Sequence, residues 1–123
     1  MTEQKNYKTA PKNIDQEGKP KMSAIPLDLL RDFLLPAYAE GFVKYYRESW
    51  RKGFKTSDMF DACLRHLTQF FYEREDYDQE ALTRYNIKKH HLGAVLFCVL
   101  CMCDTAKNHP ELDDRKDIFN GEI

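Results

Sequence analysis

The sequence predicts an all-α fold: a small bundle of about four helices with an extended N-terminal arm and a polar C-terminal tail. Apolar residues recur at helical spacing along several segments, and prolines and a glycine fall near their ends. No stretch of useful length alternates apolar and polar residues as a strand does. Because 123 residues can bury one core, we expect an arm at 1–20, one helical domain at 21–107 and a tail at 108–123.

Composition narrows the class of protein. The net charge is −1, from 19 basic and 20 acidic residues, so no overall field favours long nucleic acid or a membrane surface. The polar N-terminus lacks the apolar core of a signal peptide, and the apolar run Leu92–Cys103 is too short to span a bilayer, so we expect a cytoplasmic protein. The four cysteines, three of them in one predicted helix, are interpreted as reduced core residues, with a Cys98/Cys101/Cys103 metal site as the alternative.

The first predicted helix covers 22–34, with Pro26 in its first turn, where a missing N–H costs little. Pro36 is expected to start a new segment or a kink, because proline disrupts a helix interior. The segment 36–50 carries an apolar stripe at helical spacing. Its members are Ala37, Tyr38, Phe42, Val43 and Tyr46.

A basic loop around Gly53 precedes the next helix, predicted from Met59 to about Glu73 with Ser57 and Asp58 as candidate caps. A short helix is expected over 78–85. A last helix is expected from about Lys88 to Ala106.

On a helical wheel, the helix from Met59 has an apolar arc of roughly 140°. Its members are Met59, Phe60, Cys63, Leu64, Leu67, Phe70 and Phe71. His66 falls roughly 20° outside this arc and Glu73 roughly 40°, on the same side. His66 is therefore either a satisfied, partly buried histidine or a site residue at the border of the core.

Five carboxylates fall within eight residues at the end of this helix: Glu73, Glu75, Asp76, Asp78 and Glu80. Acidic groups at a helix C-terminus oppose the helix dipole and repel one another unless cations offset them. The cluster is either a solvated charge run or a site for Mg²⁺ or Mn²⁺, which prefer oxygen ligands.

Basic residues open the last helix, where they also oppose the dipole: Lys88, Lys89, His90 and His91. A phosphate chain held between the acidic end and this basic start would account for both charge patterns. The alternative is that the two ends neutralise each other.

A second basic stretch, "KYYRESWRKG" at 44–53, interleaves cations with aromatic residues, including the lone Trp50. Such a tryptophan can stack a base while the cations hold phosphates. The alternative is a tryptophan that closes the core beside exposed cations.

Taken in order, several segments resemble the small phage-encoded dATP/dGTP diphosphohydrolase-like proteins. The matching segments are "GKPKMSAIP" (18–26), "EGFVKYYRESWRKG" (40–53), "FDACLRHL" (60–67), "EDYDQE" (75–80) and "HHLGAVLF" (90–97). The resemblance implies a helical, Mg²⁺-dependent enzyme of the MazG kind. Such an enzyme hydrolyses a purine deoxynucleoside triphosphate between the α- and β-phosphates.

Carried over by motif, the resemblance and the charge pattern together suggest the following site. Catalysis falls to His66, Glu75 and Asp78; nucleotide binding to Lys44, Tyr45, Trp50, Arg65 and His91; Mg²⁺ or Mn²⁺ binding to Glu75, Asp76 and Asp78. The sequence departs from the family pattern at Ser49, where asparagine is usual, and at Ala94, where a second histidine is often found. It also lacks the Glu-Glu-x-x-Glu helix of MazG enzymes.

Two functions therefore stay open at this stage. One is hydrolysis of a purine nucleotide to monophosphate and pyrophosphate. The other is binding without turnover, in which the protein sequesters or senses a nucleotide, including a signalling nucleotide in host defence. The largely apolar last helix suggests extra burial, so we expect a homo-oligomer.

Overall fold

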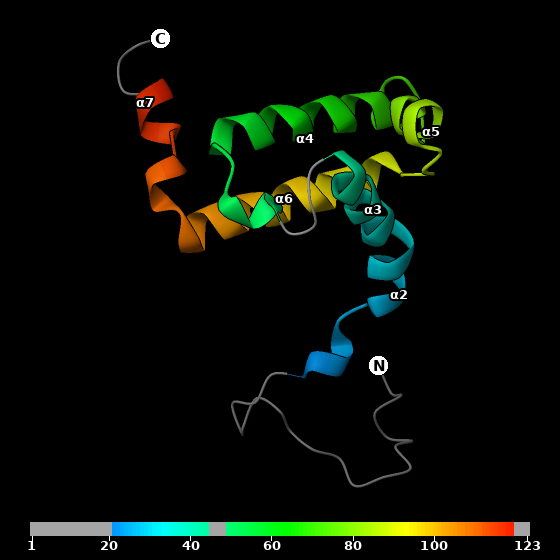
Figure 1. Ribbon diagram of the computed structural model, residues 1–123, viewed down its shortest axis with the longest axis horizontal. Coiled ribbons are helices and arrows are strands. Elements are labelled where there is room, and N and C mark those ends of the chain that lie inside the picture. The colour runs from blue at the N-terminus through cyan, green and yellow to red at the C-terminus, as the bar shows by residue number, and fades with distance from the viewer. Residues whose placement is uncertain (1–20, 45–48, 120–123) are drawn as a thin grey trace, which may run out of the picture.

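The computed structural model describes residues 21–44 and 49–119, and these residues form the all-α fold that the sequence predicts (Figure 1). The predicted arm at 1–20 lies outside the described residues. The helical elements are, in order, η2 (Met22–Ala24), α2 (Leu27–Leu29), η3 (Leu30–Leu34), α3 (Leu35–Lys44), η4 (Ser49–Lys52), α4 (Thr56–Phe71), α5 (Gln79–Tyr85), α6 (His91–Asn108), η5 (Pro110–Leu112) and α7 (Arg115–Phe119).

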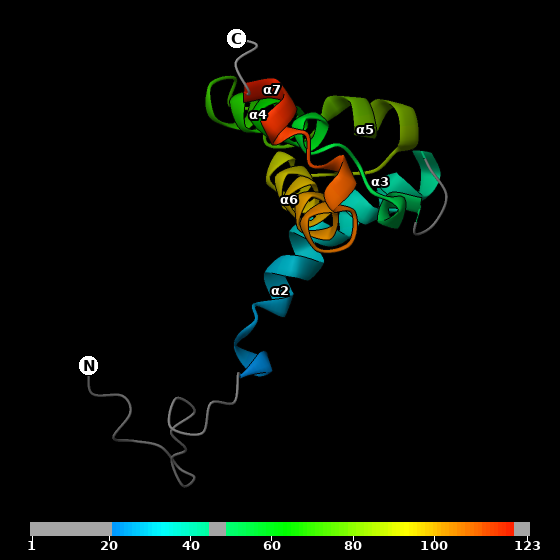
Figure 2. The ribbon, with the colours of Figure 1, turned by 90° about the vertical axis from the view of Figure 1, so that its left-hand side faces the viewer.

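The core is built on α4 and α6, which run antiparallel and make the most extensive contact between helices (Figure 1). Small side chains lie between them: Cys63 and Cys98 are buried, and the Cys63 thiol lies 3.8 Å from the Val95 carbonyl oxygen. Viewed end-on, α3 and α5 lie to one side of this pair (Figure 2). The close α4–α6 pairing fixes where the end of α4 and the start of α6 meet.

The chain stays helical through Pro36, and the change from η3 to α3 at Leu35 marks the new segment expected there. The turn before it, η3, is a π-helix, in which the Leu35 N–H bonds the Leu30 carbonyl five residues earlier. Pro36 is the second residue of α3, in its first turn, where a missing N–H costs little. The first predicted helix is in turn divided, because Ile25 and Pro26 separate η2 from α2.

Gly93 allows α6 to cross η3 closely. A Cβ at this position would lie 1.9 Å from the Phe33 carbonyl oxygen, far inside van der Waals contact. The glycine two residues after His91 therefore sets how near the start of α6 approaches the α2–α3 arm of the fold.

The predicted capping of α4 was wrong. The N-cap is Lys55, without a side-chain cap, and Ser57 lies inside the first turn. Its N–H donates instead to the Asp114 carboxylate, 3.0 Å away. The segment after α6, expected as a polar tail, contains η5 and α7 and returns to the start of α4 (Figure 1).

The predicted apolar arc of α4 is only partly buried. Cys63 is buried and Met59 and Phe70 are half-buried, but His66, placed outside the arc, is only 8% exposed. The remaining members are exposed by 52%, 46%, 39% and 70%: Phe60, Leu64, Leu67 and Phe71. The buried side of α4 is thus shifted around the helix axis from the centre of the predicted apolar arc, so that His66 faces the core.

The predicted stripe of α3 also differs from the structure. Ala37 is buried and Tyr38 half-buried, whereas Phe42 and Val43 are 45% and 58% exposed. Tyr46 lies outside the described residues.

Three of the four cysteines are buried and free, in agreement with the core interpretation: Cys63, Cys98 and Cys101. Burial raises the pKa of Cys98 to about 11 and that of Cys101 to about 12, so both stay thiols at neutral pH. Cys103 is exposed, which the core interpretation did not anticipate. Within the described part of the chain, every helix is too short or too polar to cross a lipid bilayer.

Candidate functional site

The acidic end of α4 and the basic start of α6 lie side by side. The Asp78 N–H donates to the Lys89 carbonyl and the His91 N–H to the Asp76 carbonyl, both at 2.8 Å. These bonds flank an antiparallel bridge between Tyr77 and His90. The two charge patterns that each oppose a helix dipole are therefore brought together by backbone pairing.

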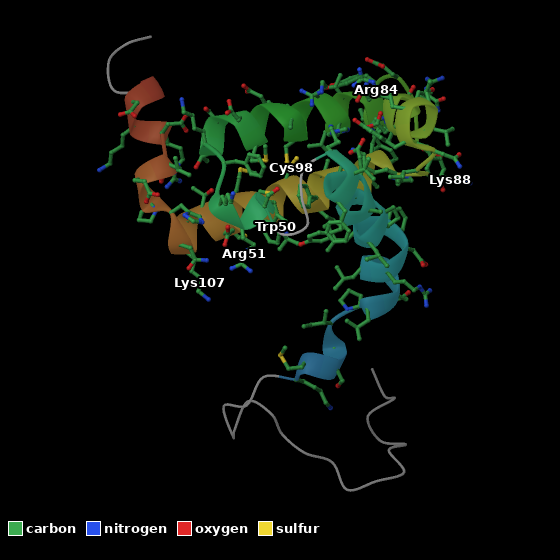
Figure 3. All side chains as sticks on the ribbon, viewed as in Figure 1. Trp50, Arg51, Arg84, Lys88, Cys98 and Lys107 are labelled. Atoms are coloured by element: carbon green, nitrogen blue, oxygen red, sulfur yellow. The ribbon has the colours of Figure 1, made fainter. Side chains whose placement is uncertain are left out.

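Because this backbone is extended, successive side chains before α6 point to opposite sides. Lys89 and His91 point inward and are 5% and 0% exposed. Lys88 instead lies 4.7 Å from the centre of the Tyr77 ring, at the α5 end of the molecule (Figure 3). His90 caps α6 by accepting from the Leu92 N–H. Of the four basic residues, Lys89 and His91 belong to the site.

A polar cavity of about 290 Å³ opens at this junction. Its walls come from α3, α4, α5 and the two paired segments. The lining residues are Lys44, Arg65, His66, Gln69, Glu75, Asp78, Gln79, Glu80 and Lys89. We call this cavity the junction pocket.

A larger cavity of about 680 Å³ lies at the opposite end of α4, between α4, α6 and α7. Its lining is mostly apolar and includes Phe60, Met102 and Ala106. Because the junction pocket gathers the histidines, cations and carboxylates, we take it as the candidate site despite its smaller volume.

His66 lines the junction pocket and contacts the fully buried His91. Nδ1 of His66 lies 2.8 Å from Nδ1 of His91, and Nε2 of His91 lies 2.7 Å from the Glu75 carboxylate. Burial, together with the nearby Lys89 and His91, lowers the pKa of His66 to about 4. His66 is therefore a neutral imidazole at neutral pH, able to accept a proton or bind a cation.

A buried lysine connects the pocket to α3. The Lys89 ammonium contacts the Glu40 carboxylate and lies 3.2 Å from Asp78, and the Lys89 and Glu40 side chains are each 7% exposed. Burial acts to raise the pKa of Asp78, but Lys89 and the backbone N–H groups of Glu80 and Ala81 outweigh it and lower the pKa. Asp78 also caps α5 through those N–H groups.

Glu40 and Lys89 were not among the predicted site residues. The available signal was the position of Glu40, three residues after Ala37 on the stripe assigned to the core. A carboxylate there requires a buried partner. The sequence does not show that Lys89, 49 positions later, supplies it.

Only two of the three predicted metal ligands line the junction pocket. Glu75 and Asp78 line the junction pocket, whereas Asp76 is exposed and is not among the lining residues. Ligand atoms of His66, Asp78 and His91 lie within 4.8 Å of one another, close enough to share one cation. Glu75 contacts His91 from the other side of its ring.

The predicted nucleotide-binding residues also lie partly at the pocket and partly away from it. Lys44 and Arg65 line the pocket, His91 is buried behind its lining residues His66 and Glu75, and Tyr45 is outside the described residues. Trp50 packs edge-on against Tyr38 and Phe97, with ring centres 5.6 and 5.9 Å away. It lies over α6, away from the end marked by Arg84 and Lys88 (Figure 3). This placement agrees with the core alternative for Trp50.

A comparison with family models matches residues 9–115, which is most of the chain, to the family described as dATP/dGTP diphosphohydrolase, N-terminal. The chain belongs to this family. No curated protein and no solved structure matches the chain. The dATP/dGTP diphosphohydrolase match includes every residue of the junction pocket, and the family name points to a hydrolase.

Proposed function

We propose that the protein hydrolyses a purine (deoxy)nucleoside triphosphate to the monophosphate and pyrophosphate, with Mg²⁺ or Mn²⁺. The observation that carries the proposal is the junction pocket itself. It brings Lys44, Arg65 and Lys89 together with Glu75 and Asp78 around His66, which contacts the buried His91. Cations for phosphate beside carboxylates for a metal ion are the groups that phosphoryl transfer needs.

The size of the pocket suggests which part of the substrate it holds. A volume of about 290 Å³ lies at the lower end for small-molecule sites. The polar lining suits the triphosphate rather than a purine ring. The nucleoside would then extend beyond the pocket, and Trp50 supplies no stacking surface inside it.

In the proposed reaction, a water oxygen bonds to the α-phosphorus and the bond from that phosphorus to the bridging oxygen breaks. The electron pair leaves with pyrophosphate. The proton of the water goes to His66 or to a pocket carboxylate, Glu75 or Asp78. Lys44, Arg65 and Lys89 offset the charge on the phosphates. A divalent cation bound by the pocket carboxylates would add charge neutralisation.

One observation favours the second candidate, nucleotide binding without turnover. The Lys89 ammonium already contacts both Glu40 and Asp78. This fixed cation already offsets the charge of one of the two carboxylates, so the pocket can hold its shape and bind phosphates through its cations with no metal ion. A protein of this kind would sequester or sense a purine nucleotide.

Incubation with dATP or dGTP and Mg²⁺ or Mn²⁺, followed by phosphorus NMR, separates the two candidates. Hydrolysis predicts equimolar monophosphate and pyrophosphate, lost in Asp78→Asn. Because Asp78 also caps α5, Glu75→Gln serves as a second variant, with circular dichroism to check folding. Tight binding without products supports sequestration. Absence of both binding and products contradicts both candidates.

We further propose that the protein is a homo-oligomer. Exposed apolar side chains lie along both core helices, and we call these positions the α4–α6 face: Phe60, Leu64, Leu67 and Phe71 of α4, with Leu96, Val99 and Leu100 of α6. The two phenylalanines, 52% and 70% exposed, expose roughly 250 Å² if each ring residue carries about 200 Å². A stable interface buries about 800 Å² on each partner, so this face would supply its apolar centre.

The order of residues on α4 favours a second copy as the occupant. The spacing Phe-x₃-Leu-x₂-Leu-x₃-Phe from Phe60 to Phe71 reads the same in both directions. A copy related by a two-fold axis would lay α4 antiparallel on itself, pairing Phe60 with Phe71 and Leu64 with Leu67. Two-fold interfaces require this kind of self-complementarity.

The state of the cysteines bears on the cellular compartment in which the protein acts. We propose that the protein acts in the cytoplasm, that of the host if the chain is encoded by a phage. Free cysteines buried in its core suit a reducing compartment.

A further inference from the structure

Three metal-binding side chains converge from three separate segments. His66 comes from the middle of α4, Asp78 from the cap of α5, and His91 from the first position of α6. One ligand atom of each lies within 4.8 Å of the other two. All three are shielded from solvent: His66 and His91 are 8% and 0% exposed, and the Asp78 side chain is 13% exposed.

The spacing of the two imidazoles fits a shared ion. Their Nδ1 atoms lie 2.8 Å apart. Two nitrogen ligands bound at about 2.05 Å and at a right angle to each other lie about 2.9 Å apart. The two Nδ1 atoms, which are at hydrogen-bonding distance in the metal-free protein, are thus also spaced as neighbouring ligands on one ion.

The outer contacts of these side chains also suit metal binding. His91 directs Nδ1 toward His66, and its Nε2 lies 2.7 Å from Glu75. Histidines that bind metals commonly donate the second ring N–H to a carboxylate, which fixes tautomer and orientation. Glu75 is in position to accept this bond. Asp78 Oδ1 accepts from the backbone N–H groups of Glu80 and Ala81, whereas Oδ2 lies 3.2 Å from the Lys89 ammonium and keeps a second lone pair for a cation.

We propose that His66, Asp78 and His91 bind a divalent first-row transition ion, such as Mn²⁺, Fe²⁺ or Co²⁺, with Glu75 as a positioning residue. Two imidazole nitrogens and a carboxylate oxygen are a donor set for these ions, whereas Mg²⁺ prefers oxygen ligands alone. The inference deepens the proposed function by naming the cation and its ligands; with His66 and Asp78 bound to the ion, Glu75 is the pocket group left to take the proton of the attacking water. Only the role of the ion in hydrolysis rests on that function, because ion binding stands on the side-chain geometry.

The direct test uses the unaltered full chain, stripped of metal with a chelator and loaded with Mn²⁺. Pulsed electron paramagnetic resonance detects nitrogen nuclei bound to Mn²⁺. We expect nitrogen modulation that changes frequency when the protein is made with ¹⁵N-histidine. Bound Mn²⁺ with no histidine nitrogen signal, or no bound Mn²⁺, overturns the inference. This readout needs neither a variant nor turnover.

Calorimetric titration with Co²⁺, Mn²⁺ and Mg²⁺ adds a second measurement. We expect Co²⁺ and Mn²⁺ to bind more tightly than Mg²⁺, and His66→Gln to remove this preference. Glu75→Gln is expected to weaken transition-ion binding by about 10- to 100-fold, the usual effect of losing an outer partner. His109→Gln, at the far end of α6, is the matched control and should bind as the wild type does.

The two proposals fail separately. Hydrolysis of dATP or dGTP with Mg²⁺, combined with no nitrogen coordination to Mn²⁺, overturns the metal assignment and leaves the proposed function standing. Histidine-coordinated Mn²⁺ with no nucleotide binding does the reverse.

Discussion

The Nδ1 atoms of His66 and His91 lie 2.8 Å apart, although 25 residues and a complete helix separate the two side chains in the sequence. The contact exists because the segment after α4 pairs with the backbone that leads into α6. At least one of these nitrogens carries a hydrogen in the metal-free protein, since two bare nitrogen lone pairs at this distance repel.

The stability of the metal-free protein should fall as pH drops from about 6.5 to 4. Burial and the neighbouring cations lower the pKa of His66 from 6.5 to about 4. In this window the unfolded chain takes up a proton that the folded chain does not, so the free energy of unfolding decreases, by up to about 3 kcal/mol. Urea unfolding at several pH values measures this loss.

The variant His66→Gln is the control, because it removes the titrating group that faces Lys89, His91 and Asp78. Its free energy of unfolding should vary less between pH 6.5 and 4 than that of the wild type. If the pH dependence of the free energy of unfolding is the same in His66→Gln as in the wild type, the loss comes from other groups. Asp78 is one of them, because its pKa is lowered in the folded protein and its protonation in acid also reduces stability.

Lys89→Met should destabilise the fold by about 3 kcal/mol or more, because breaking a buried ion pair leaves charge uncompensated. The change leaves the buried Glu40 and Asp78 carboxylates without their shared ammonium. Chemical denaturation measures the effect. The double variant Glu40→Leu/Lys89→Met should recover part of the stability. A loss of stability in the double variant equal to the sum of the losses in the two single variants contradicts the pairing.

Gly93→Ala should destabilise the fold, by about 1–3 kcal/mol or more, because its Cβ would overlap the Phe33 carbonyl oxygen. Gly41→Ala is the matched control. It lies within α3, where a Cβ meets nothing within 4 Å, so alanine should stabilise by about 0.5–1 kcal/mol. Thermal melting of both variants checks the prediction, and equal shifts would contradict the close crossing of α6 and η3.

The predictability of this fold from sequence depended on local signals. Helical periodicity located α4 and α6, and a short helix was expected over 78–85, where α5 lies. Which part of the α4 apolar arc is buried was not predictable, because the arc is wider than the surface that α6 covers. Its exposed part, with Phe60 and Phe71, was assigned to a core within one chain.

The candidate site was partly predictable for a related reason. Charges of the disfavoured sign at two helix ends indicated the junction, and the resemblance to the diphosphohydrolase-like family added His66 and His91. Glu40 was missed because its role depends on Lys89, a contact made only in the folded chain. Trp50 was assigned to the site because an aromatic residue among cations has the same pattern in a core as in a base-binding surface.

The double variant Leu64→Gln/Leu67→Gln should convert an oligomer into monomers. Both residues lie at the centre of the α4–α6 face, where polar side chains would be desolvated on association. Light scattering coupled to size-exclusion chromatography gives the mass. Leu27→Gln, at a 66% exposed position on α2, is the control for loss of an exposed leucine. A monomeric wild type at all concentrations contradicts the proposed interface.

The central claim, that a nucleotide's triphosphate lies between the end of α4 and the start of α6, is tested most directly by amide NMR of the ¹⁵N-labelled protein. The probes are the α,β-methylene analogues of dATP and dGTP, which cannot be hydrolysed at that bond, added with Mg²⁺ or Mn²⁺ at saturating concentration; Mg²⁺ gives the sharper spectra. We expect the largest shifts at His66, at 75–80 and at 89–91. Shifts confined to the cavity beside Phe60 and Met102, or no shifts at all, would contradict the account.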